Sequence, residues 1–152
     1  MTDQRTGAAG VLHLTERIAA PPDTVFDFLI EPEMMLRWMG TEADLKPEPG
    51  GTFWLKVTGS NIASGTYVEV DRPNRVVFTW GWDHSTDVPP GSSTVTITLT
   101  ADGGDTVVDL FHAGLPGGPE DEHSKGWTFF LARLVIVAAG GELDPSGQGV
   151  PQ

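Results

Sequence analysis

A series of turn signals divides residues 42–112 into segments of strand length, and this division limits the folds open to the chain. Glycine, proline, asparagine and aspartate favour tight turns, and groups of them recur here at hairpin intervals. Between these groups, apolar and polar residues alternate, which is typical of strands with one buried face. We therefore predict a long antiparallel meander, with turns at Pro49-Gly50-Gly51, Gly59-Ser60-Asn61, Arg72-Pro73-Asn74, Pro89-Pro90-Gly91 and Asp102-Gly103-Gly104.

The same alternation predicts which side chains of three strands face the core. The clearest strand runs from Thr94 to Thr100, where apolar residues alternate with four threonines. Two indoles fall at the end of one inward stripe, because successive side chains on a strand point to opposite faces. The predicted inward positions are Val76, Phe78, Trp80 and Trp82, then Val95, Ile97 and Leu99, and finally Val108, Leu110 and His112.

Helical signals flank the meander on both sides. A first strand is predicted near residues 12–18, and Pro22 and Pro32 then suit the first turns of two short helices. A long helix is predicted to begin near Pro119, where the next three residues are acidic and the helix dipole favours negative charge. It ends at Gly140-Gly141, and its apolar stripe consists of Trp127, Phe130, Leu131, Leu134 and Ala138.

The length of 152 residues fits one domain. We place this domain at residues 11–141. Residues 1–10 are small and polar, and residues 142–152 are rich in glycine and proline, so we expect a disordered N-terminus and a flexible C-terminal tail.

Composition and charge argue against several classes of partner. The chain has no cysteine, which excludes disulfides and thiolate metal sites. Its formal net charge of -12 opposes binding to nucleic acid or to anionic membranes. We expect no signal peptide, because the first ten residues do not have the pattern of one, and the apolar run of residues 129–141 is too short to cross a bilayer. We therefore expect a cytoplasmic protein.

Several ordered segments resemble one protein family. They are RIAAPPDTVFDFLIEPEMMLRWM from Arg17, GGTF from Gly50, GTYVEVDRPNRVVFTW from Gly65, and the later HAGLP and HSKGWTFFLARL segments. Together they resemble the family named after the C-terminal domain of the heat-shock-protein-ninety ATPase activator, within the START-like and birch-pollen-allergen-like (SRPBCC) superfamily. The resemblance implies an α+β helix-grip fold, in which a curved antiparallel sheet wraps around a long C-terminal helix and two short helices follow the first strand.

The resemblance leaves three classes of function open, because one fold hosts many activities. We expect first a binding protein for a small hydrophobic or aromatic molecule, with a role linked to stress or metabolism. The enzyme alternative is a cavity-dependent cyclase or hydratase. The third alternative is an interaction module that contacts a chaperone. No nucleophile motif, phosphate loop or dinucleotide fingerprint is present, so we favour binding over catalysis.

The candidate ligand-binding residues are aromatic side chains that the implied fold brings around one cavity. The alternative is that they form a packed core in which each indole N–H has a partner. His112 is a candidate for orienting a ligand or for acting as a general base, and its structural alternative is a satisfied core histidine. The ligand-binding set is Trp38, Trp80, Trp82, His112, Trp127 and Phe130.

Metal binding and self-association follow from the last helix. Glu120 and His123 have the spacing of half a carboxylate and histidine metal site, but only one copy exists, so we expect no metal and no cofactor. Phe129 and Ile136 lie nearly opposite the Trp127 stripe on a helical wheel. A helix that is apolar on two sides needs a second cover, which is either a loop of the same chain or a second subunit, and we expect a homodimer.

Overall fold

The computed structural model describes residues 11–86, 88–115 and 122–143. The predicted disordered segment 1–10 and most of the predicted tail 142–152 lie outside this description. The protein is α+β, and its elements in chain order are β1 (Leu12–Ile18), α2 (Pro22–Ile30), α3 (Pro32–Met35), β2 (Glu42–Leu45), β3 (Thr52–Thr58), β4 (Asn61–Asp71), β5 (Arg75–Trp80), β6 (Ser93–Asp102), β7 (Asp105–Ala113) and α4 (Glu122–Ala138).

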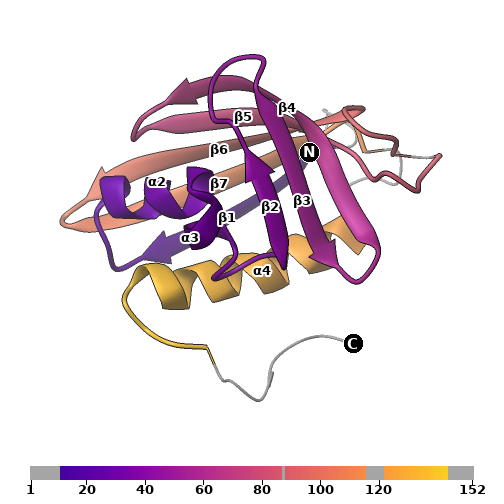
Figure 1. Ribbon diagram of the computed structural model, residues 1–152. Helices are drawn as coiled ribbons and strands as arrows, with labels where there is room; N and C mark the ends of the chain where they lie inside the picture. Colours follow the sequence, from indigo (N-terminus) through magenta and orange to yellow (C-terminus); the bar gives the residue numbers. More distant parts are fainter. Residues whose placement is uncertain (1–10, 87, 116–121, 144–152) are drawn as a thin grey trace, which may run out of the picture.

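One antiparallel sheet contains the seven strands of the described residues, in the order β1-β7-β6-β5-β4-β3-β2. Strands β2 to β7 follow one another as the meander that the turn signals predict (Figure 1). The exception to sequential pairing is β1, which pairs with β7 so that Leu12 lies opposite His112. The first strand of the chain therefore forms one edge of the sheet, and β2 forms the other.

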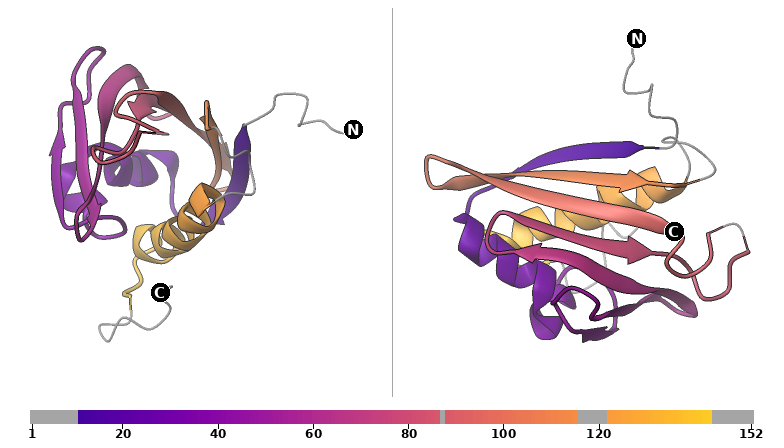
Figure 2. Two further views of the ribbon diagram at one scale, coloured as in Figure 1. Left: turned by 90° about the vertical axis from the view of Figure 1, so that its right-hand side faces the viewer. Right: turned by 90° about the horizontal axis from the view of Figure 1, so that it is seen from above.

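The sheet is curved, and the helices lie on its concave side. In the left view of Figure 2, the strands curl around α2 and α4, and α4 lies across the open side of the curve. Arg133 on α4 donates from Nε to the backbone carbonyl of Trp38, at 3.0 Å, which ties this helix to the segment after α3. The arrangement is consistent with the helix-grip fold.

Alternating burial places the core on the concave face, as the two-residue period predicts. On β6, Val95, Ile97 and Leu99 are buried while the threonines between them are partly exposed. On β7, Val108, Leu110 and His112 are completely buried. Trp82 departs from the predicted stripe because β5 ends at Trp80, and it pairs with the sheet only through an isolated bridge.

The buried face of α4 differs from the predicted stripe at one position. Phe130 is only partly buried. Three residues along an ideal helix correspond to a rotation of about 60° away from Trp127, so Phe130 flanks the contact line. The predicted start near Pro119 lies outside the described residues, and the buried residues of the helix are Trp127, Leu131, Leu134, Val137 and Ala138.

Candidate functional site

Trp80 lies at the centre of an aromatic cluster on the concave face. It is 2% exposed and closes β5, where the inward stripe of that strand ends. Its ring centroid lies 5.2 Å from those of both Trp82 and Trp127, which come from the loop after β5 and from α4. Edge and tilted geometries of this kind are favourable for aromatic pairs. The remaining partners of Trp80 are Phe53 at 5.8 Å, Phe78 at 6.4 Å and His112 at 5.9 Å.

A chain of hydrogen bonds behind the cluster joins α4 to three strands. Trp127 donates its indole N–H to His112 Nδ1 at 3.0 Å. The other imidazole nitrogen, Nε2, lies 2.8 Å from Ser93 Oγ, and that hydroxyl donates to the backbone carbonyl of Trp80 at 2.7 Å. A hydroxyl has one hydrogen to give, so Ser93 Oγ must accept from His112. His112 is therefore neutral, with its proton on Nε2.

Burial keeps the His112 imidazole uncharged. Removal from water, followed by the nearby imidazole of His123, lowers the pKa of His112 from 6.5 to about 3. Both of its nitrogens are engaged, and the unprotonated Nδ1 accepts the Trp127 N–H. A general base needs a free lone pair directed at a substrate proton. In this arrangement His112 serves to orient Trp127.

The cluster extends towards solvent at the loop that follows β5. Trp82 is partly buried and donates its indole N–H to His123 Nε2 at 2.9 Å. On its other side the ring of His84 stacks at a centroid distance of 6.3 Å, and His84 Nε2 lies 2.7 Å from Asn61 Oδ1. The indole of Trp82 therefore connects the loop after β5 to the first turns of α4.

Two buried polar atoms of the concave face have no hydrogen-bond partner within the described part of the chain. They are Trp80 Nε1 and Tyr67 Oη. Tyr67 is 1% exposed, and burial raises the pKa of its hydroxyl well above the ordinary value, so the hydroxyl stays protonated. Buried donors of this kind are usually satisfied, because leaving one unpaired costs roughly 1–3 kcal/mol.

The structure brings together four of the six predicted site residues: Trp80, Trp82, His112 and Trp127. Trp38 is buried elsewhere and donates its indole N–H to the carbonyl of Phe28 at 2.8 Å. Phe130 pairs with Phe129, at a centroid distance of 4.9 Å. Among the described residues, no ring contact joins either of them to the cluster.

Sequence reasoning missed three polar members of this region. Ser93 starts β6 two positions before the inward residue Val95. The two-residue period therefore predicts that the Ser93 side chain also faces the core. Tyr67 stands beside a register irregularity between itself and Glu69, which interrupts the alternation and leaves Val68 52% exposed. The spacing of His123 from Glu120 indicates only a possible metal ligand, and its contact with Trp82 depends on how α4 docks, for which the sequence carries no local signal.

The sequence matches the family described as "Activator of Hsp90 ATPase homolog 1-like protein" over residues 19–139. This match covers most of the chain. The chain belongs to this family. An AHSA1-like protein from Rhizobium etli, whose solution structure is known, is 42% identical, with 95% of this chain and 91% of that chain covered and a TM-score of 0.72. A comparison with curated protein sequences gave no match.

More distant structures share the fold of this AHSA1-like protein. An HSP90 activator from Plasmodium falciparum is 23% identical, with 84% of this chain and 95% of that chain covered and a TM-score of 0.69. The Aha1 dimer from Colwellia psychrerythraea is 13% identical, with 88% and 98% covered and a TM-score of 0.74. At these identities the likeness shows the fold alone.

Two further features of the AHSA1-like chain bear on its possible partners. No group of three or more histidine or acidic side chains suited to a metal ion occurs in residues 11–86, 88–115 and 122–143, and Glu120 of the predicted half-site lies outside those ranges. Within the same ranges, no helix has the length and apolar character needed to span a membrane.

Proposed function

We propose that this AHSA1-like protein binds a small, mainly apolar molecule between the concave face of the sheet and α4. The observation that carries the proposal is the buried indole N–H of Trp80, which has no acceptor among the described residues. The Trp80 ring itself contacts five other aromatic rings. Ligand sites in proteins typically combine an apolar lining with a few polar atoms that fix orientation.

A comparison among the tryptophans supports this assignment. Trp38, Trp82 and Trp127 each donate to a protein acceptor, namely a backbone carbonyl or a histidine nitrogen. Trp80 is buried to the same extent as Trp38 and Trp127 but lacks such an acceptor. A bound molecule that supplies an acceptor atom would remove the cost of this unpaired donor.

The roles within the proposed site differ from residue to residue. We assign Trp80, Trp82 and Trp127 as contacts of the bound molecule, since their rings meet one another. His112 acts as a positioning residue, because it holds the indole of Trp127. Trp38 and Phe130 are peripheral to this assignment.

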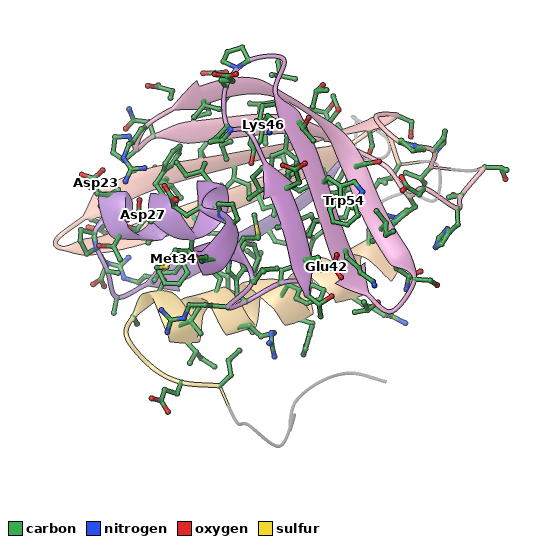
Figure 3. The ribbon with its side chains drawn as sticks, in the orientation of Figure 1. Asp23, Asp27, Met34, Glu42, Lys46 and Trp54 are labelled. Carbon is green, nitrogen blue, oxygen red and sulfur yellow. The ribbon has the colours of Figure 1, made fainter. Side chains whose placement is uncertain are left out.

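The test is titration with N-phenyl-1-naphthylamine, an uncharged fluorescent probe, followed by probe emission and by tryptophan quenching. The proposal predicts binding with a stoichiometry near one and weaker binding by Trp80→Leu. Trp54→Leu is the matched control, because Trp54 lies on β3 between the inward residues Phe53 and Leu55 and is partly exposed (Figure 3). Absence of binding by the parent protein, or equal effects of the two substitutions, would contradict the proposal.

The catalytic alternative has weaker support. A cyclase or hydratase that uses His112 as a general base needs an imidazole with a free lone pair near neutral pH. Both nitrogens of His112 are engaged, and its pKa is lowered to about 3. Chemistry at this position would require the Trp127 hydrogen bond to break first.

Contact with a chaperone is a second candidate function, favoured by the family match and by the relative described as an HSP90 activator. Its test is the ATPase rate of an Hsp90-type chaperone with and without this protein. Stimulation that saturates with concentration would support the candidate, and an unchanged rate would contradict it.

Self-association through α4 is the remaining proposal for a partner. Ile136 is 43% exposed on the outer side of the helix, whereas Phe129 is partly buried under the guanidinium of Arg133. A second copy covering Ile136 would bury this apolar position. Light scattering at micromolar concentration tests the proposal, with Ile136→Asp expected to give a monomer. A monomeric parent protein would contradict it.

A further inference from the structure

The hydroxyl of Tyr67 is a second buried donor on the surface that carries Trp80. Tyr67 lies on β4 directly opposite Phe78 of β5, and Trp80 follows Phe78 by two positions on the same face. The ring of Phe53 lies 5.9 Å from that of Tyr67 and 5.8 Å from that of Trp80. Two unpartnered donors therefore flank one aromatic surface.

The other buried polar side chains are already occupied. Among the described residues these are Ser93, Thr106 and His112. The Ser93 hydroxyl donates to the Trp80 carbonyl, and the Thr106 hydroxyl donates to the Ala20 carbonyl at 2.7 Å. His112 bonds through both nitrogens. The donors left for a bound molecule are Trp80 Nε1 and Tyr67 Oη.

The concave face also offers no charge to pair with an ionised group. No lysine, arginine, aspartate or glutamate is buried in the described part of the chain. Tyr67 and His112 are both neutral near pH 7, since burial raises the pKa of one and lowers that of the other. An unpaired charge in such surroundings is strongly disfavoured.

We infer that this surface recognises an uncharged, mainly apolar molecule that presents acceptor oxygens of the carbonyl or ether type to both Trp80 Nε1 and Tyr67 Oη. An indole N–H only donates, so the molecule must supply the acceptor there. The inference rests on the proposed binding function and adds the chemical class of the ligand. It also assigns Tyr67 as a specificity-determining residue, which sequence reasoning did not identify.

The test compares two planar probes of similar size, 2,6-diacetylnaphthalene and 2,6-diethylnaphthalene. The first has two acceptor oxygens and the second has none. Each hydrogen bond to a neutral acceptor contributes about three- to tenfold in affinity, so the diketone is expected to bind at least about tenfold more tightly. A third probe, naphthalene-2,6-dicarboxylate, is expected to bind more weakly than the diketone because its charges stay unpaired.

Tyr67→Phe is the decisive variant. It removes only the hydroxyl, so the diketone should weaken about three- to tenfold while the affinity for the hydrocarbon stays unchanged. Thr106→Val is the matched control, because it deletes a buried hydroxyl that already has a partner. The ratio of the two dissociation constants should not change in that control.

The outcomes separate this inference from the proposed function. If neither neutral probe binds the parent protein, the proposed function fails and the inference fails with it. If both bind with equal affinity, or if Tyr67→Phe leaves their ratio unchanged, binding stands and the inference is overturned. Tighter binding of the dicarboxylate than of the diketone also overturns it.

Discussion

The buried neutral imidazole of His112 makes stability depend on pH in a direction that the structure fixes. The pKa of His112 is about 3 in the folded protein and about 6.5 in an unfolded chain. Below pH 6.5 the unfolded chain therefore binds a proton that the folded protein does not accept. This component of stability is fully present above pH 6.5, and it is lost progressively as the pH falls from 6.5 towards 3.

The size of this loss in unfolding free energy follows from the pH interval between the folded and unfolded pKa values of His112. Each pH unit in it changes the unfolding free energy by about 1.4 kcal/mol for one group. Between pH 7 and pH 5 the loss assigned to His112 is therefore about 2 kcal/mol. The lower pH stays above the sequence pI of about 4.4, which keeps the protein negatively charged during the measurement.

Carboxylates also titrate in acid, so the experiment needs a variant that removes only this titration. His112→Gln is suitable, because the glutamine amide can accept from Trp127 and donate to Ser93 while carrying no charge at any pH. Urea unfolding followed by tryptophan fluorescence at pH 7 and pH 5 gives the free energies for both proteins. The parent should lose about 2 kcal/mol more than the variant. Equal losses would refute the buried neutral histidine.

Four substitutions test other parts of the structure. Leu134→Ala should lower the unfolding free energy by about 2–5 kcal/mol, because Leu134 is completely buried, whereas Thr128→Ala at an exposed position of α4 should change it by about 0.5 kcal/mol at most. Gly81→Ala places a Cβ 1.7 Å from the Pro89 carbonyl oxygen, so we expect a loss of about 1–3 kcal/mol and a change in indole emission as the loop moves. Thr106→Val should cost about 1–2 kcal/mol in urea unfolding by leaving a buried carbonyl unpaired, and a neutral effect would contradict that hydrogen bond.

The sequence predicted the sheet well, because the information there is local. The two-residue period identified the inward faces of β6 and β7, including His112, and the turn signals separated the strands of the meander. The resemblance added the family, which the match over residues 19–139 confirms. Periodicity could not show that β1 pairs with β7, since that pairing joins distant parts of the chain.

The candidate site was predicted less completely, because its decisive features are contacts between elements. Sequence spacing placed Trp80 and Trp127 on inward faces, but it could not show that Trp127 bonds to His112 while Trp80 lacks an acceptor. The implied fold predicted that Trp38 would line the same cavity, because it stands at the end of a predicted helix. Its indole N–H in fact bonds to a nearby carbonyl of α2.

The pairing of the first strand with the last has a consequence for the order in which the protein is assembled. His13 on β1 and Asp109 on β7, whose side chains lie 2.9 Å apart, are 96 positions apart in the chain. At a synthesis rate of about 5–20 residues per second, β1 waits roughly 5–20 seconds for its partner to be made. The hairpins of β2 to β6 can pair during that interval, since their contacts are short in sequence. The surface completed by His112 and Trp127 is therefore among the last parts of the nascent protein to form.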